Sequence, residues 1–241
     1  MPNQPTISVI IPVYNEERTI SSIVEIARTW GKSQEVIVVN DGSTDHTLEA
    51  LRQFGSRIRL ISYNKNHGKG YAMAKGVEAA TGDLLMFLDG DITGLSHNDL
   101  DAMAGPVTDG NVDMVIGVAR FWGVGSFEPF NEVSGERVLR KTALLPHLKA
   151  LRVAGRGAEF LINDIHKKKR VVSVRLAYVF ILGKMDKQPA PEALLEYVKE
   201  AREFLVQIVK IQSKDLPPQA KRVFRIAQNY IKQALVYLQS P

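Results

Sequence analysis

Short apolar runs alternate with segments of helical periodicity in the first half of the chain. Short runs in which most residues are apolar predict strands that are buried on both faces, as in parallel sheets. Five such runs occur, at residues 7–11, 36–39, 58–61, 84–88 and 114–116. Between the first two runs, apolar residues recur on one helix face: Ile20, Ile23, Val24 and Ala27. This alternation predicts parallel strand pairing through right-handed crossovers.

We therefore expect an α/β fold with a mostly parallel central sheet flanked by helices. In such sheets, ligands bind beyond the carboxyl ends of the strands. We expect the first strand to end at Pro12 and Asn15 to cap the helix that follows. Glu16 and Glu17 would then lie in the first turn of that helix, where carboxylates complement the helix dipole.

The second half of the chain has a different pattern. Residues 121–156 are less regular and rich in glycine and basic residues, and 171–179 form a late candidate strand. Farther along, 192–212 and 219–238 each carry an apolar stripe at helical spacing, and two prolines separate them. We expect these two segments to form a C-terminal helical hairpin.

Composition narrows the class of protein. Hydrophobic residues make up 45% of the 241 residues and charged residues 24%, as in soluble globular proteins, and cysteine is absent. This excludes disulfides and thiolate metal sites. We see no signal peptide and no apolar run near the roughly 18 residues that span a bilayer, so we expect a cytoplasmic protein. The net charge of +5 favours acidic partners, which include nucleotide phosphates, anionic lipids and nucleic acid.

The strongest chemical signal is Asp89-Gly90-Asp91, directly after an apolar run. Alternate residues of a strand point the same way, so both carboxylates can face one point. Mg²⁺ and Mn²⁺ prefer such oxygen ligands, completed by substrate phosphates. For an isolated motif, an acidic turn that merely ends a strand is the alternative. The position at the carboxyl edge of an α/β sheet favours a divalent metal site.

Two further polar segments follow predicted strands. Asp41, within residues 40–43, is placed to accept hydrogen bonds from a ribose or a base, although the segment also suits a simple turn with a helix cap. Residues 66–70, Asn-His-Gly-Lys-Gly, offer backbone N–H groups and a cation to phosphate. We interpret His67 as a loop residue. Neither a Walker A spacing nor a Gly-x-Gly-x-x-Gly motif after the first strand is present, which argues against a dinucleotide oxidoreductase.

Together these motifs resemble glycosyltransferase family 2, whose inverting enzymes have the GT-A fold. Four segments carry the resemblance in the family's order and spacing: SVIIPVYNEE (8–17), EVIVVNDGSTDHT (35–47), NHGKGYAMAKG (66–76) and ATGDLLMFLDGDI (80–92). Within the family, the chain looks most similar to dolichyl- and polyprenyl-phosphate sugar synthases, and secondly to glucosyl-phosphoglycerate synthases.

The resemblance implies roles for individual residues. The residues that would bind the nucleotide are Pro12, Tyr14, Glu16, Asp41, Lys69 and Asp89. The ligands of a Mg²⁺ or Mn²⁺ ion on the diphosphate would be Asp89 and Asp91. The acceptor phosphate would be faced by Arg120, Ser134, Arg137 and Arg140, because guanidinium groups suit phosphate. The catalytic residues would be Asp91 and Glu159.

The implied activity is the transfer of one sugar, with inversion, from a UDP- or GDP-linked sugar to a polyprenyl phosphate. A hydroxyl acceptor would need a carboxylate base, for which Glu159 and then Asp164 are candidates. The Gln-x-x-Arg-Trp signature of processive synthases is absent, which favours a single transfer. Residues 117–120, Gly-Val-Ala-Arg, depart from the family's Gly-Ser-Arg.

Other functions stay open at this stage. They are transfer to a soluble acceptor such as phosphoglycerate or a saccharide hydroxyl, nucleotidyl transfer, and nucleotide-sugar binding without catalysis. A nucleic-acid partner is not expected, because the chain lacks the aromatic and basic strand pattern of RNA-binding modules.

The predicted domains are a GT-A catalytic domain over 1–188 and the hairpin over 189–241. The first comprises a nucleotide-sugar half at 6–120 and an acceptor half at 121–188. Basic residues of the hairpin and of the tract 167–170 suit an anionic surface on the inner face of a membrane. The alternative is a hairpin that packs its apolar stripe on the domain.

Overall fold

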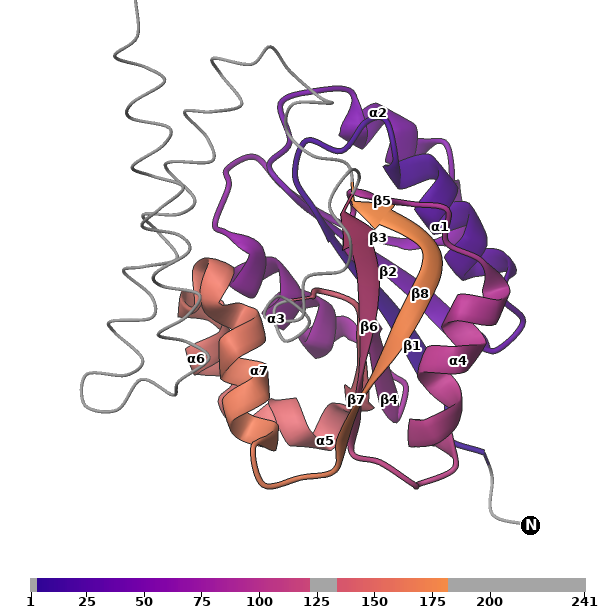
Figure 1. Cartoon of the computed structure of the whole chain (residues 1–241). Helices are drawn as coiled ribbons and strands as arrows, with labels where there is room; N and C mark the ends of the chain where they lie inside the picture. Colours follow the sequence, from indigo (N-terminus) through magenta and orange to yellow (C-terminus); the bar gives the residue numbers. More distant parts are fainter. Residues whose placement is uncertain (1–3, 122–133, 182–241) are drawn as a thin grey trace, which may run out of the picture. The chain divides into compact units, whose positions relative to one another are not determined.

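The computed structural model describes residues 4–121 and 134–181 (Figure 1). The predicted hairpin and the predicted boundary at residue 188 lie outside these residues. The strands are β1 Ile7–Val13, β2 Ser33–Asp41, β3 Arg59–Tyr63, β4 Leu84–Phe87, β5 Ile92–Thr93, β6 Met114–Phe121, β7 Arg137–Arg140 and β8 Val171–Ile181. The α-helices are α1 Ile20–Thr29, α2 Thr47–Arg52, α3 Lys69–Ala79, α4 His97–Thr108, α5 Lys141–Leu144, α6 Leu148–Val153 and α7 Ala158–His166.

The strands form one sheet in the order β3-β2-β1-β4-β7-β6-β8-β5. β3, β2, β1 and β4 pair in parallel, as the alternation of strands and helices predicts. β7 runs antiparallel between β4 and β6, whereas β8 is again parallel to β6. The predicted α/β fold with a mostly parallel sheet flanked by helices is confirmed, with one reversed strand in its interior.

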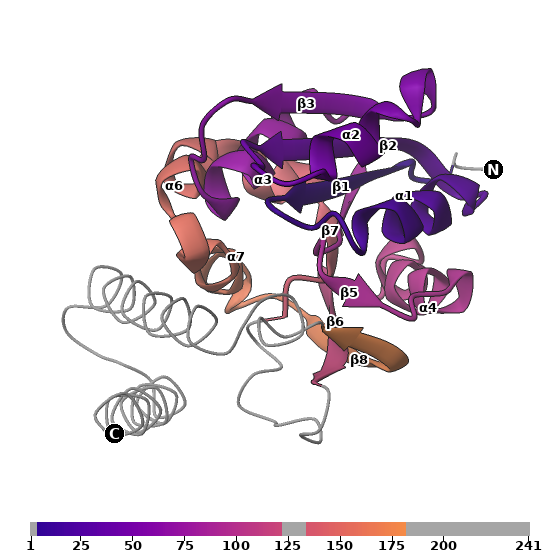
Figure 2. The same ribbon diagram turned by 90° about the horizontal axis from the view of Figure 1, so that it is seen from above.

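Helices cover both faces of the sheet, and alternate residues of β1 belong to two different cores. Val9 and Ile11 pack in the core that includes α1, α2 and α4. Ile10 packs in the core that includes α3, α6 and α7. Figures 1 and 2 show α1 and α4 on one side of the sheet and the second group of helices on the other. Each aliphatic side chain that is fully buried in this way stabilises the fold by about 1.5–3 kcal/mol.

β1 continues through Pro12 to Val13, past the predicted end. The Ile10 carbonyl oxygen accepts a 3.1 Å hydrogen bond from the Leu88 N–H, so the backbone groups of Ile10 face β4. The backbone groups of Pro12, two residues farther along the strand, also face toward β4. β4 ends at Phe87, opposite Ile10, so the missing N–H of Pro12 costs no hydrogen bond to β4.

α1 begins at Ile20, and the prediction that Asn15 caps it is wrong. Asn15 has a φ of 57°, in the left-handed region, and its Oδ1 accepts a 2.8 Å hydrogen bond from the Thr44 N–H. This bond ties the loop after β1 to the loop after β2. Glu16 and Glu17 therefore precede the helix, whose first turn contains no acidic residue.

Among the described residues, no helix combines the length and the apolar character that crossing a membrane requires.

Candidate active site

The predicted motifs meet at one edge of the sheet, where the parallel strands β1, β2 and β4 end. Two loops touch there. Thr19 Oγ1 donates a 2.5 Å hydrogen bond to the Gly90 carbonyl oxygen. A Cβ atom at Gly90 would lie 3.1 Å from Glu16 Cγ. The segment after β1 and the 89–91 turn therefore form one continuous surface.

The two aspartates of the predicted metal site lie beyond the strand. β4 ends at Phe87, so Asp89 and Asp91 belong to the turn that follows, and both are partly buried. The alternation of side chains along a strand, which we invoked from the sequence, therefore does not orient them. Asp89 is positioned instead by its contacts with Lys69 and Gly135.

Lys69, the first residue of α3, bridges two carboxylates. Its Nζ lies 2.7 Å from Asp89 Oδ1 and 2.6 Å from Glu159 Oε1. The side chains of Lys69, Asp89 and Glu159 are 28%, 22% and 5% exposed. Burial alone would lower the pKa of the Lys69 ammonium, but the two carboxylates outweigh burial and raise this pKa above its ordinary value. The cluster therefore holds one cation between two acidic groups.

A close backbone approach brings Glu159 to this lysine. A Cβ atom at Gly70 would lie 2.3 Å from the Leu151 carbonyl oxygen and 3.0 Å from Gly155 N, so only glycine fits. The start of α3 therefore packs directly on the end of α6 and on the turn that leads into α7. Glu159 lies in the first turn of α7, where the helix dipole favours a carboxylate.

The segment before β7 lines another side of Asp89. A Cβ atom at Gly135 would lie 2.1 Å from Asp89 Oδ2. The neighbouring Glu136 is fully buried, and its Oε2 lies 2.5 Å from Ser134 Oγ. Burial, and then the charge of Asp89, raise the pKa of Glu136 to about 8. Sequence reasoning missed Glu136, because it lies between a glycine and an arginine and no pattern of apolar residues there indicates that its carboxyl group is buried.

Asp41 organises the loop that leads to Lys69. Its Oδ1 accepts a 3.0 Å hydrogen bond from the His67 N–H, and its Oδ2 accepts a 2.6 Å bond from the Gly68 N–H. Burial raises the pKa of Asp41, although these backbone donors oppose the shift. His67 is an exposed loop residue, as we interpreted it, and its ring stacks on Tyr71 at 4.6 Å between centroids. Contact of Asp41 with a ribose stays a prediction.

The remaining residues predicted to bind nucleotide also lie where β1 ends. Pro12 is buried as the last but one residue of β1, Tyr14 is 43% exposed, and Glu16 is partly buried. The Glu16 N–H donates a 2.8 Å hydrogen bond to Thr47 Oγ1, which fixes this loop against α2. The structure thus brings these residues to the same edge as Lys69, and their contacts with a nucleotide stay predictions.

The predicted acceptor residues are not gathered at one place. Ser134 lies beside Asp89 through its neighbour Gly135. Arg120 lies near the end of β6, in register with Phe180 of β8.

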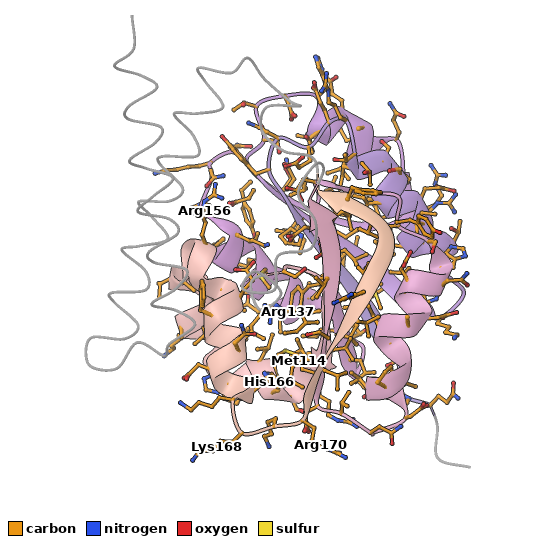
Figure 3. The ribbon with its side chains drawn as sticks, viewed as in Figure 1. Met114, Arg137, Arg156, His166, Lys168 and Arg170 are labelled. Carbon is orange, nitrogen blue, oxygen red and sulfur yellow. The ribbon has the colours of Figure 1, made fainter. Side chains whose placement is uncertain are left out.

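Arg137 is fully buried, which corrects the expectation that it faces an acceptor. Its Nη1 lies 2.5 Å from Asn163 Oδ1 of α7, and its Nε donates a 3.0 Å hydrogen bond to the Ser134 carbonyl oxygen. Figure 3 shows Arg137 with Met114 and His166 between the sheet and the helices beside it. This guanidinium ties β7 to α7 inside the protein.

Arg140 lies at the opposite edge of the sheet from Asp89, which corrects its predicted role as well. It pairs with Leu84, at the amino end of β4, because β7 runs antiparallel to β4. The basic tract 167–170 has a similar position, since β8 begins at Val171 opposite the first residue of β6. Figure 3 shows Lys168 and Arg170 at this end of the molecule.

The donor set at the edge fits a hard divalent cation. Asp89 and Asp91 offer the carboxylate oxygens that Mg²⁺ and Mn²⁺ prefer, and Asp89 already accepts a cation, the Lys69 ammonium. Within residues 4–121 and 134–181, no three His, Cys, Asp or Glu side chains are grouped closely enough to hold a metal ion by themselves. Substrate phosphates and water would therefore supply the remaining ligands, as is usual for Mg²⁺.

Comparison with curated proteins gives partial matches. The chain is 36% identical over 94 residues to an undecaprenyl-phosphate 4-deoxy-4-formamido-L-arabinose transferase of Edwardsiella ictaluri, which covers 36% of this chain and 29% of that protein. It is 36% identical over 124 residues to glycosyltransferase AglE of Haloferax volcanii, which covers 48% of this chain and 40% of that protein. The chain thus spans less than half the length of these relatives.

A solved structure and a family model each match a larger part of the chain than these relatives do. A glucosyl-3-phosphoglycerate synthase of Mycobacterium tuberculosis, in complex with Mn²⁺, UDP-glucose and phosphoglyceric acid, has a similar fold, with a TM-score of 0.63 and 23% identity over 84% of this chain and 79% of that chain. This likeness shows the GT-A fold. The model of glycosyl transferase family 2 matches residues 8–154, from β1 to the end of α6. The protein therefore belongs to glycosyl transferase family 2.

Proposed function

We propose that this protein is an inverting glycosyltransferase that moves one sugar from a UDP- or GDP-linked sugar to a polyprenyl phosphate. The observation that carries the proposal is the charged cluster at the sheet edge, where Asp89 and Glu159 share Lys69 at 2.7 and 2.6 Å. Acidic groups gathered at the carboxyl ends of parallel strands suit a metal-bound nucleotide diphosphate. The undecaprenyl-phosphate transferase described above supports the acceptor class.

Asp89 and Asp91 would hold the divalent cation, Mg²⁺ or Mn²⁺. When bound, this ion offsets the negative charge that develops on the leaving nucleotide diphosphate. The protein prepares Asp89 for this task by packing Gly135 against one carboxylate oxygen and Lys69 against the other. Tyr14 and Glu16, on the adjoining loop, would contact the nucleotide.

Whether the reaction needs a base depends on the acceptor. A phosphate monoester, with a second pKa of about 6, is largely dianionic near neutrality and attacks without losing a proton. A hydroxyl must give its proton to a carboxylate within hydrogen-bond reach. Glu159 is buried beside the site, whereas Asp164 is exposed and pairs with Lys167 at 2.7 Å. We therefore assign Glu159 as the base for any hydroxyl acceptor.

A soluble phosphorylated acceptor, such as phosphoglycerate, is the second candidate. The solved structure of similar fold is a complex with phosphoglyceric acid and UDP-glucose. An acceptor of this kind would attack through its hydroxyl group, so its reaction would depend on Glu159.

A donor and acceptor panel tests the proposal. UDP- and GDP-sugars are incubated with Mg²⁺ or Mn²⁺ and with either polyprenyl phosphate or phosphoglycerate, using the wild type, Glu159→Gln and the control Asp164→Asn. We expect transfer to polyprenyl phosphate from one donor, within about tenfold of wild type in Glu159→Gln, because no base is needed. Transfer only to phosphoglycerate, with a loss of at least about 100-fold in Glu159→Gln, would replace the lipid by the soluble acceptor. No hydrolysis or transfer with any donor would refute the activity.

Peripheral attachment to the inner face of a membrane belongs to this proposal, because the acceptor is a lipid. The tract 167–170 lies at the sheet edge opposite Asp89, so it does not lie beside the site. Co-sedimentation of the full chain with anionic vesicles is the expected result, and the absence of binding would remove the membrane part of the proposal.

A further inference from the structure

The position of Lys69 runs against the local preference of its helix. It is the first residue of α3, where the helix dipole repels a cation. The ammonium is nevertheless held there by Asp89 and Glu159, at 2.7 and 2.6 Å. The two carboxylates carry one negative charge more than the lysine neutralises. Lys69 is therefore the counter-cation of this cluster.

The backbone around Lys69 is fixed, so only its side chain is free to change partners. Gly68, with a φ of 96°, turns the chain into α3, and Asp41 binds the Gly68 N–H at 2.6 Å. Gly70 is packed against the Leu151 carbonyl oxygen, where no Cβ atom fits. Lys69 thus extends from a rigid base toward two acceptors.

Two cations cannot share one carboxylate oxygen without a cost. Mg²⁺ binds a carboxylate oxygen at a distance of about 2.0–2.1 Å. The Lys69 ammonium already lies 2.7 Å from Asp89 Oδ1. Repulsion between the ion and the ammonium would then favour the lysine contact with Glu159 over the contact with Asp89.

We propose that Lys69 is a positioning residue that holds Asp89 and Glu159 in place and competes with the divalent cation for Asp89. This inference rests on the proposed function. Binding of the cation with its nucleotide sugar moves the lysine charge from Asp89 onto Glu159. The lysine thereby weakens cation binding to the free protein and links occupancy of the donor site to the electrostatic state of Glu159.

Mn²⁺ binding without nucleotide tests the competition directly. Free Mn²⁺ is followed by electron paramagnetic resonance during titration of the full chain. We expect Lys69→Met to bind Mn²⁺ at least about tenfold more tightly than wild type, because a nearby positive charge is removed. The control Lys75→Met, in the same helix but paired with Glu78, should leave the affinity unchanged. Unchanged or weaker binding by Lys69→Met would overturn the proposal.

A second variant keeps the test decisive if Lys69→Met does not fold. In Glu159→Gln the ammonium has Asp89 as its only charged partner in the cluster, so Mn²⁺ should bind about tenfold more weakly than to wild type. Equal affinity would contradict the competition.

The variant Asp89→Ala distinguishes a failure of this inference from a failure of the proposed function. If Asp89→Ala abolishes Mn²⁺ binding while Lys69→Met leaves it unchanged, the metal site stands and the role of Lys69 fails. If the aspartate variant binds Mn²⁺ like wild type, the metal site of the proposed function fails as well.

Discussion

Glu136 shows how burial changes the chemistry of a carboxyl group. Ser134 Oγ lies 2.5 Å from both the Gly117 carbonyl oxygen and Glu136 Oε2. The Ser134 hydroxyl has one proton, which it can donate either to the Gly117 carbonyl oxygen or to Glu136 Oε2. Both hydrogen bonds form at once only when Glu136 is protonated and donates to Ser134 Oγ. Burial, and then the nearby charge of Asp89, raise the pKa of Glu136 to about 8, which agrees with this count. The group is therefore protonated at neutral pH.

Replacing Glu136 by Gln should change how stability depends on pH. The carboxyl group ionises near pH 8 in the folded protein, against 4.5 as its ordinary value, so its stabilising contribution is complete below 4.5 and is lost as the pH rises through about 8. The amide of Glu136→Gln stays neutral. We expect the Tm of wild type to fall more steeply than that of the variant from about pH 5 to about pH 9 in thermal unfolding. Parallel slopes would contradict this assignment.

Single residues could be predicted where a motif fixes their place along the chain. Asp89 follows a strand and Lys69 begins a helix, and both lie at the expected edge. Arg137 and Arg140 could not be placed, because a pattern of charges does not distinguish a buried guanidinium from an exposed one. The register of β7 decides their positions, and register depends on pairing with strands far away in the sequence.

At the scale of elements, the sequence indicated neither the two-residue strand β5 nor β7. β7 has only four residues and begins and ends with arginine, so its apolar centre is too short for a recognisable pattern. The parallel strands β1 to β4 could be predicted, because a helical segment joins each to the next. β7 enters antiparallel between β4 and β6 and carries residues 134–136 to the functional edge.

Gly135→Ala tests the contact that this insertion creates. The new Cβ atom would lie 2.1 Å from Asp89 Oδ2, so the carboxylate must move. We expect metal-dependent turnover of the donor to fall by about 100-fold, since small displacements at a reacting centre have effects of this size. The matched control is Gly105→Ala in α4, where no atom lies within 4 Å of the added Cβ.

The control should keep wild-type turnover and gain about 0.5–1 kcal/mol in stability, because alanine is the better helix former. Wild-type turnover in Gly135→Ala, measured beside a cooperative thermal transition, would show that Asp89 is not held by this contact.

At the scale of the whole molecule, the fold class and the edge of the sheet at which the polar motifs meet could be predicted together. Parallel strands bring their carboxyl ends to one edge, so polar motifs after β1, β2 and β4 had to converge there. The distribution of charge could not be predicted. The tract 167–170 reads as a basic surface in the sequence, but the pairing of β8 with β6 sets it at the far edge.

Binding of the nucleotide sugar with and without Mn²⁺ tests the central claim most directly. Calorimetric titration of the identified donor should show binding that Mn²⁺ strengthens in wild type and in Asp164→Ala, an exposed aspartate of α7. In the double variant Asp89→Ala and Asp91→Ala, the effect of Mn²⁺ should vanish, and sugar transfer should fall at least about 1000-fold. Retention of both the Mn²⁺ effect and the transfer rate in that double variant would contradict the account.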